Sequence, residues 1–173
     1  MTNRILTIPK HKLKFDNGIT LDTDVWIKYS NHMLYRDIKE NSRLFYRIIP
    51  YLIITNNDRY LVLKNNGHYC FNINSLCYIK ENMEFDPIKS AVKASVQTNN
   101  IKAKSLKCCG FIKSIYEYPN DIAVLYIATT DDKIKNNNME WMNLDDLIDK
   151  CRKFDSFGIE YINYLVIQKI KRR

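Results

Sequence analysis

Residues 87–101 read PIKSAVKASVQTNNI, and this stretch predicts a helix whose position decides the fold. Its apolar residues recur at the spacing of a single helical face: Ile88, Ala91, Val92 and Val96. Asp86 is suited to cap this helix, and Pro87 is suited to its first turn. The other side of the helix carries Lys, Ser, Gln, Thr and Asn, and no acidic residue occurs between Asp86 and Glu117.

The composition predicts one packed domain. With 173 residues, 46% hydrophobic and 12% aromatic, the chain is long and apolar enough to bury a sizeable core. It has only 4 Gly and 4 Pro, so we expect no long flexible linker. No apolar run approaches membrane-spanning length, and the N-terminal sequence MTNRILTIPKHK lacks the apolar segment of a signal peptide. We therefore expect a cytoplasmic protein with no membrane association.

The cysteines and the net charge each leave an alternative open. The 5 Cys residues form no CxxC pair, which favours reduced core thiols. A zinc site is the alternative, with His68, Cys70, Cys77, Cys108 and Cys109 as its ligands. The net charge of +8 is compatible with nucleic-acid binding, but the dense basic cluster at residues 169–173 fits a solvated helix end equally.

The order of the predicted elements indicates a mixed α+β fold, with a helix packed on a largely antiparallel sheet. Strands are expected at residues 4–9, 47–55, 59–64, 68–79, 103–118, 122–129 and 139–142. Helices are expected at 87–101, 144–151 and 155–171, with a short one within 21–35. Turns are expected at 56–58, 65–67 and 119–121, so the first long strands form a hairpin.

This series resembles the Nudix (MutT-like) superfamily, whose signature reads G-x5-E-x7-R-E-U-x-E-E-x-G-U, with U aliphatic. Four segments match, in order, the landmarks of a bacterial Nudix-like group described as phosphoesterases: RILTIPKHKL, RIIPYLIITNNDRYLVLK, MEWMNLDDL and FDSFGIEYI. The resemblance implies an α/β/α sandwich in a single domain over 1–173. Its parts would be an N-terminal extension (1–45), a core (46–143) and C-terminal helices (144–173).

The helix of the signature segment departs from the family at every carboxylate. With Ile101 at the final aliphatic position, Lys93 falls on the arginine and Asn100 on the closing glycine. The three glutamates of the motif are replaced by Ala94, Gln97 and Thr98. Only Glu84 falls at or beside the first glutamate of the motif.

These departures imply a loss of catalysis. Nudix enzymes cleave nucleoside diphosphate derivatives with Mg²⁺ or Mn²⁺, and hard cations require carboxylate oxygens. Neutral side chains cannot take over that role, so we expect no catalytic residue, no metal and no cofactor. The alternative is an atypical hydrolase in which displaced acids hold Mg²⁺, with Glu84 near Glu117 or Asp121.

Without catalysis, the fold predicts a binding protein. Lys80, Lys89 and Lys93 would place positive charge near the former metal position, and Tyr78 and Tyr116 would contact a base. The competing interpretation is that the lysines form a solvated helix face and the tyrosines pack on the sheet. The favoured function is a regulatory protein that binds a nucleotide-like molecule or a protein partner. A basic nucleic-acid-binding domain is a further alternative, and the sequence does not indicate an oligomeric state.

Overall fold

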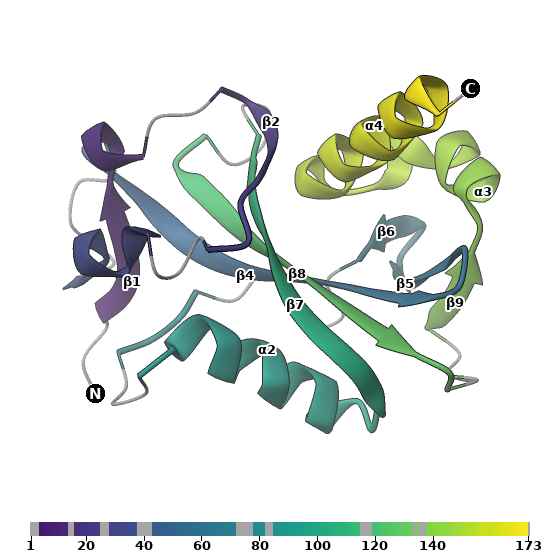
Figure 1. Ribbon diagram of the computed structural model, residues 1–173, viewed down its shortest axis with the longest axis horizontal. Coiled ribbons are helices and arrows are strands. Elements are labelled where there is room, and N and C mark those ends of the chain that lie inside the picture. The colour runs from purple at the N-terminus through teal and green to yellow at the C-terminus, as the bar shows by residue number, and fades with distance from the viewer. Residues whose placement is uncertain are drawn as a thin grey trace.

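The computed structural model describes residues 4–13, 16–24, 28–37, 43–71, 78–81, 85–114, 119–132, 134 and 138–172. Figure 1 shows a central sheet with α2 on one face and α3 and α4 on the other. The helices are α2 (Pro87–Thr98), α3 (Leu144–Asp149) and α4 (Ser156–Lys171), with 3₁₀ turns η1 (Lys10–Lys12), η2 (Ser30–His32) and η3 (Cys151–Lys153). This three-layer arrangement confirms the predicted α+β sandwich.

The described residues form one mixed sheet with strand order β2-β7-β8-β4-β1-β3; β5 also pairs with β4, and β6 and β9 pair with β5. The strands are β1 (Arg4–Pro9), β2 (Gly18–Leu21), β3 (Leu34–Asp37), β4 (Phe45–Asn56), β5 (Arg59–Asn65), β6 (His68–Cys70), β7 (Ala103–Lys113), β8 (Asp121–Thr130) and β9 (Met139–Met142). Among the strands that the structure describes, only β4 and β8 pair in parallel, from Arg47↔Asp121 to Thr55↔Thr129. The sheet is therefore largely antiparallel, as predicted.

Strand β4 separates two hydrophobic cores. Its side chains alternate between the faces of the sheet, because successive residues of a strand point in opposite directions. Toward α2 it presents Ile48, Leu52 and Ile54. Toward α3 and α4 it presents Ile49, Tyr51 and Ile53. Both faces are covered, which explains why this segment is an almost continuous apolar run rather than an alternating one.

Helix α2 forms at the predicted place, with Ile88, Val92 and Val96 of the predicted stripe buried and Ala91 half-buried. The Asp86 side chain caps it, accepting a 2.9 Å hydrogen bond from the Lys89 amide. After the helix, Asn100 has φ 53°, a left-handed conformation that asparagine tolerates better than most residues. Ile101 follows and is buried. The alignment that placed Asn100 on the closing glycine therefore agrees with the backbone.

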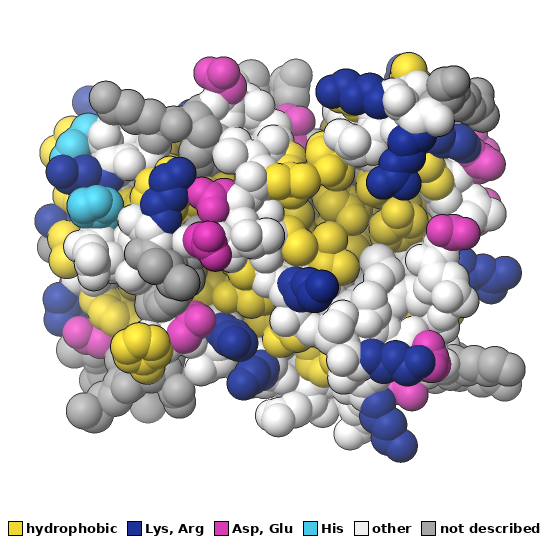
Figure 2. All heavy atoms as spheres, viewed as in Figure 1, with side chains coloured by type: hydrophobic (Ala, Val, Ile, Leu, Met, Phe, Trp, Pro, Cys, Tyr) yellow, Lys and Arg dark blue, Asp and Glu magenta, His cyan; other side chains and the backbone are white. Residues whose placement is uncertain are grey.

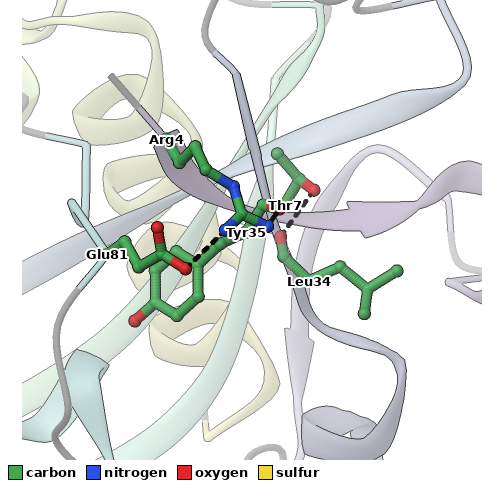
Figure 3. Close-up of polar contacts among 5 residues, drawn as sticks. All are labelled: Arg4, Thr7, Leu34, Tyr35 and Glu81. Carbon is green, nitrogen blue, oxygen red and sulfur yellow. Dashed lines mark hydrogen bonds and ion pairs between the residues drawn. The ribbon is translucent and has the colours of Figure 1, made fainter. Parts of the chain in front are cut away.

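The start of the chain is bonded to the segment that leads into α2, as Figure 3 shows. The Arg4 guanidinium donates to Glu81 Oε1 and to the Tyr35 carbonyl, both over 2.7 Å. The Thr7 hydroxyl donates to the Leu34 carbonyl over 2.8 Å. The approach to α2 is thereby attached to β1 and, through β1, to β3.

Within 21–35, where a short helix was predicted, Lys28 and Tyr29 are helical, and residues 25–27 lie outside the described part of the chain. Two strands that were not predicted flank this segment: Leu21 ends β2, and β3 begins at Leu34. Strands β2 and β3 are short and lie at the sheet's two ends, so they carry no clear alternating pattern. The strand predicted at 68–79 is reduced to β6, and residues 72–77 lie outside the described part of the chain.

The remaining differences concern element ends. Strand β7 stops at Lys113, whereas the prediction continued to 118, and residues 115–118 are not among those described. Helix α3 ends at Asp149 and η3 follows it. Asn143 caps α3 and Asp155 caps α4. No helix in the described ranges is both long and apolar enough to cross a membrane.

Candidate functional site

A cleft of about 320 Å³ opens beside the first turn of α2, and we call it the α2 cleft. Its lining residues come from four elements or their ends: Thr23, Asp24, Asp86, Lys89, Leu106, Cys108 and Tyr126. The floor belongs to β7 and β8, one wall to the start of α2, and the other wall to the segment after β2. This volume lies at the lower end of the range found for small-molecule sites.

The wall after β2 depends on a close approach between two backbones. Strand β2 pairs with β7 as far as Leu21↔Gly110, and the Asp22 amide then donates to the Cys109 carbonyl over 3.0 Å. Gly110 has φ 147°, and a Cβ there would lie 2.0 Å from the Thr20 carbonyl oxygen. Glycine is therefore required for β2 to cross at this point and for the residues after it to reach the cleft.

Asp24 is the site residue that sequence reasoning missed. The neighbouring Asp22 side chain accepts from the Asp24 amide at 3.1 Å and pairs with Lys28 at 3.1 Å. Asp24 and Asp86 line the same cleft, although 61 residues separate them in the chain. No local pattern could have shown this, because the approach depends on the pairing of β2 with β7.

The floor of the α2 cleft holds groups that stay neutral at physiological pH. Burial raises the pKa of the Cys108 thiol to about 11. Burial also raises the pKa of the Tyr126 phenol, and the neighbouring Cys108 and Asp86 raise it further. The charged residues that line the cleft, Asp24, Asp86 and Lys89, belong to its walls.

The positions that the Nudix resemblance assigns to the arginine and the three glutamates of the motif lie on the outer face of α2. Lys93, Ala94, Gln97 and Thr98 are all exposed, and the Thr98 hydroxyl donates back to the Ala94 carbonyl over 2.8 Å. Figure 2 shows basic side chains over the first half of this helix and mainly uncharged polar ones over the second half. These side chains do not fit Mg²⁺ or Mn²⁺, because none of them is a carboxylate.

The predicted ligand residues are divided between different places. Lys89 lines the α2 cleft, and Lys93 lies one turn further along the exposed face of α2. Lys80 is exposed and forms an isolated bridge with Ile5. Tyr78 packs against the core beneath α3 and α4, on the opposite face of the sheet from Lys89. Tyr116 lies outside the described residues.

Among the acids of the alternative metal site, Asp121 is already engaged. Its side chain is fully buried, pairs with Arg47 Nε at 2.5 Å and accepts a 3.4 Å hydrogen bond from the Tyr78 hydroxyl. Burial raises the pKa of Asp121, and the Arg47 guanidinium opposes that rise. Asp121 lies directly after the turn at 119–120 and begins β8, but it is buried rather than solvated. Glu84 and Glu117 are outside the described part of the chain.

The zinc alternative has no counterpart in the described ranges. No group of three or more His, Cys, Asp or Glu side chains able to hold a metal ion occurs among the residues that the structure describes. Cys70, Cys108, Cys109 and Cys151 are not in disulfides, and the Cys70 thiol donates to Asp155 Oδ2 over 3.3 Å. Cys77 is not among the described residues.

Known proteins match the fold but not the sequence. No protein-family model matches this chain, and neither does any curated protein sequence. The structure is similar to the crystal structure of Tm1382, "a putative Nudix hydrolase", with a TM-score of 0.72 and 17% sequence identity. The match covers 95% of this chain and 99% of that chain. The chain therefore has a Nudix-like fold, which confirms the fold that the sequence landmarks predicted.

Proposed function

We propose that this chain is a Nudix-fold binding protein that holds a nucleotide-like ligand in the α2 cleft without hydrolysing it. One observation carries the proposal: the outer face of α2 presents Lys93, Ala94, Gln97 and Thr98 where the family signature has its basic residue and carboxylates. Without those carboxylates, the charge on a diphosphate is not neutralised by a metal and water is not activated. Such a protein would keep a cleft in which a ligand can bind, and we propose that this binding has a regulatory role.

The lining of the α2 cleft suggests how such a ligand would lie. The Lys89 ammonium is placed to bind a phosphate, with Lys93 one turn away. The neutral floor of Leu106, Cys108 and Tyr126 suits the flat face of a base. Asp24 and Asp86 repel phosphate, so the ribose or the base would lie beside them. Their carboxylates would accept hydrogen bonds from ribose hydroxyls or a base amino group.

A thermal-shift screen of nucleotides in EDTA, compared with the same screen in Mg²⁺, tests the proposal. We expect at least one nucleotide to raise the melting temperature without metal, because a ligand that binds only the folded state stabilises it. Lys89→Gln should remove that rise, whereas Lys104→Gln, the same change on an exposed strand residue paired with Asp131, should retain it. If no nucleotide gives a shift, the ligand hypothesis fails and a protein partner becomes the favoured interpretation.

A second candidate is the atypical hydrolase, and one observation favours it. Asp24 and Asp86 share the α2 cleft, so two carboxylates lie in one site even though they are not the acids that sequence reasoning selected. Mn²⁺-dependent release of nucleoside monophosphate, lost in Asp24→Asn and in Asp86→Asn, would establish this candidate and end the favoured one. Asparagine at position 86 retains the helix cap, so the fold is conserved in that variant.

A further inference from the structure

The charged side chains that line the α2 cleft do not neutralise one another. Asp24 and Asp86 contribute two negative charges and Lys89 contributes one positive charge, so the lining has a net charge of −1. In the part of the chain that the structure describes, the Lys89 ammonium forms no ion pair with either carboxylate. All three groups are therefore available to a ligand, and two of them repel anions.

The positive end of α2 is already occupied by one of these carboxylates. The backbone N–H groups and the dipole at a helix N-terminus commonly bind phosphate. Here Asp86 Oδ1 accepts from the Lys89 amide over 2.9 Å, so a carboxylate of the chain itself holds that position. The Lys89 ammonium is then the sole cationic side chain among the described lining residues, which leaves the cleft with room for one phosphate.

Charges just outside the lining do not give the cleft a surplus of positive charge. Lys28 pairs with Asp22 at 3.1 Å, so these two residues together add no net charge beside the wall after β2. Lys93 lies one turn further along the exposed face of α2, and counting it brings the local charge only to zero. The net charge of +8 belongs to the whole chain, and physiological salt largely screens charges that are more than about 8 Å away.

The two walls present hydrogen-bond acceptors. Ionised carboxylates such as those of Asp24 and Asp86 only accept hydrogen bonds, so a ligand has to offer donors to them. The vicinal hydroxyls of a ribose and the amino group of a base are donors of this kind. A volume of about 320 Å³ also limits the ligand, because it lies near the bottom of the range of about 300–1,000 Å³ for small-molecule sites. The cleft therefore suits a compact ligand with many donors and little negative charge.

We propose that the α2 cleft selects a nucleoside monophosphate over the corresponding di- and triphosphates, with the phosphate on Lys89 and the donors of the ribose and base on Asp24 and Asp86. This inference rests on the proposed function and narrows it to ligands with one phosphate. Each further phosphate adds negative charge to a lining that is already net negative, so Asp24 and Asp86 determine specificity by repulsion. A metal-dependent diphosphate site has the opposite preference, because its cation offsets the added charge.

Calorimetric titration of the whole chain in EDTA, with the 5′-mono-, di- and triphosphates of adenosine, guanosine, cytidine and uridine, tests this selection. For a base that binds, we expect the dissociation constant to rise about tenfold from monophosphate to triphosphate. Asp24→Asn removes one negative charge at an exposed position and should lower the triphosphate constant about fivefold, with little change for the monophosphate. The matched control is Asp149→Asn, an exposed position at the end of α3 on the opposite face of the sheet, which should leave every constant unchanged.

The outcomes separate this inference from the proposed function. If a triphosphate binds in EDTA as tightly as its monophosphate or more tightly, the proposed function stands and the selection by charge is wrong. If no nucleotide binds, both fail together. Equal effects of Asp24→Asn and Asp149→Asn would assign the preference to the overall charge of the protein and overturn the role of Asp24. Added salt should narrow the gap between the two ligands, because it screens the repulsion, and a wider gap would contradict the mechanism.

Discussion

Helices α2 and α4 lie on opposite faces of the same sheet, but they are held there by different interactions. Helix α4 is fixed by an aromatic core and by polar contacts: Asp155 caps it, accepting from the Gly158 amide over 2.8 Å and from the buried Tyr51 hydroxyl over 2.9 Å. Helix α2 is fixed by an aliphatic stripe and one cap, and all the side chains of its outer face are in solvent.

This difference teaches which parts of the fold are free to change. Residues of α4 serve the packing and the polar network together, so their replacement disturbs the scaffold. The outer residues of α2 contribute little to packing, so the acids of a metal site can be replaced there without loss of the fold. The predictions below probe this contrast, beginning with the largest effect.

Phe157→Ala should be the most damaging substitution. Phe157 belongs to α4, and its ring is fully buried with its centroid 5.8 Å from that of the Tyr51 ring. Alanine therefore leaves a cavity in the core. We expect a loss of about 3–5 kcal/mol in the free energy of unfolding, measured by urea denaturation. Ile167→Ala, on the exposed side of α4, is the control and should cost less than about 1 kcal/mol. Similar losses in the two variants would contradict the packing described for this helix.

Asp155→Ala should have the next largest effect. It removes the cap of α4 and leaves the buried Tyr51 hydroxyl without this acceptor, for a combined loss of about 2–4 kcal/mol. Asp155→Asn retains an acceptor oxygen and should be clearly milder. Thermal and urea unfolding of both variants measure the difference. Equal losses would mean that the charge of Asp155, rather than its hydrogen bonds, stabilises this face.

Asp86→Ala should cost about 1 kcal/mol, because α2 loses its cap but retains its apolar stripe. Asp86→Asn should restore most of this loss, since asparagine caps helices equally well. Urea midpoints of the three proteins give the comparison. A loss as large as that of Asp155→Ala would show that α2 depends on polar contacts as much as α4 does.

Replacing Ala94, Gln97 and Thr98 together by glutamate should change the stability by less than about 1 kcal/mol. All three positions are exposed, so the added charges stay in water. We also expect this variant to bind Mn²⁺ more tightly than wild type does, measured by calorimetry. A loss of more than about 2 kcal/mol would reveal contacts of these side chains that the fold does not predict.

Cys108 should react slowly with iodoacetamide at neutral pH, and this test requires no substitution in the chain. Its pKa of about 11 leaves roughly one thiolate in ten thousand at pH 7, and the neutral thiol is a poor nucleophile. The alkylation rate should rise about tenfold per pH unit up to about pH 10, followed by peptide mass spectrometry. The urea-unfolded chain provides the reference, with an ordinary thiol pKa. Equal rates in the folded and unfolded chains at pH 7 would mean that this floor of the cleft is open to water.

Local signals in the sequence predicted much of the fold. The cap at Asp86, the stripe of α2 and the hairpin of β4 and β5 follow from neighbouring residues, and Asn57 at the hairpin turn has φ 52°. The parallel pairing of β4 with β8 was not predicted, because it joins segments about 70 residues apart. The approach of Asp24 to Asp86 escaped prediction for the same reason.

Site residues were harder to predict than elements. Tyr78 belongs to a chemically suitable class, yet its ring stacks with Arg47 on the far side of the sheet from Lys89. The face that a residue occupies depends on the path of the chain between strands, and that path is not encoded in residue type.

The close contact between β2 and β7 restricts position 110 to glycine. Any side chain there would push β2 away from β7, and β2 leads directly to Asp24. The same change would therefore distort one wall of the cleft even though position 110 does not line it. Sequence drift can proceed along the outer surface of α2, but at this one position a single codon change would reshape the opening that a ligand must enter.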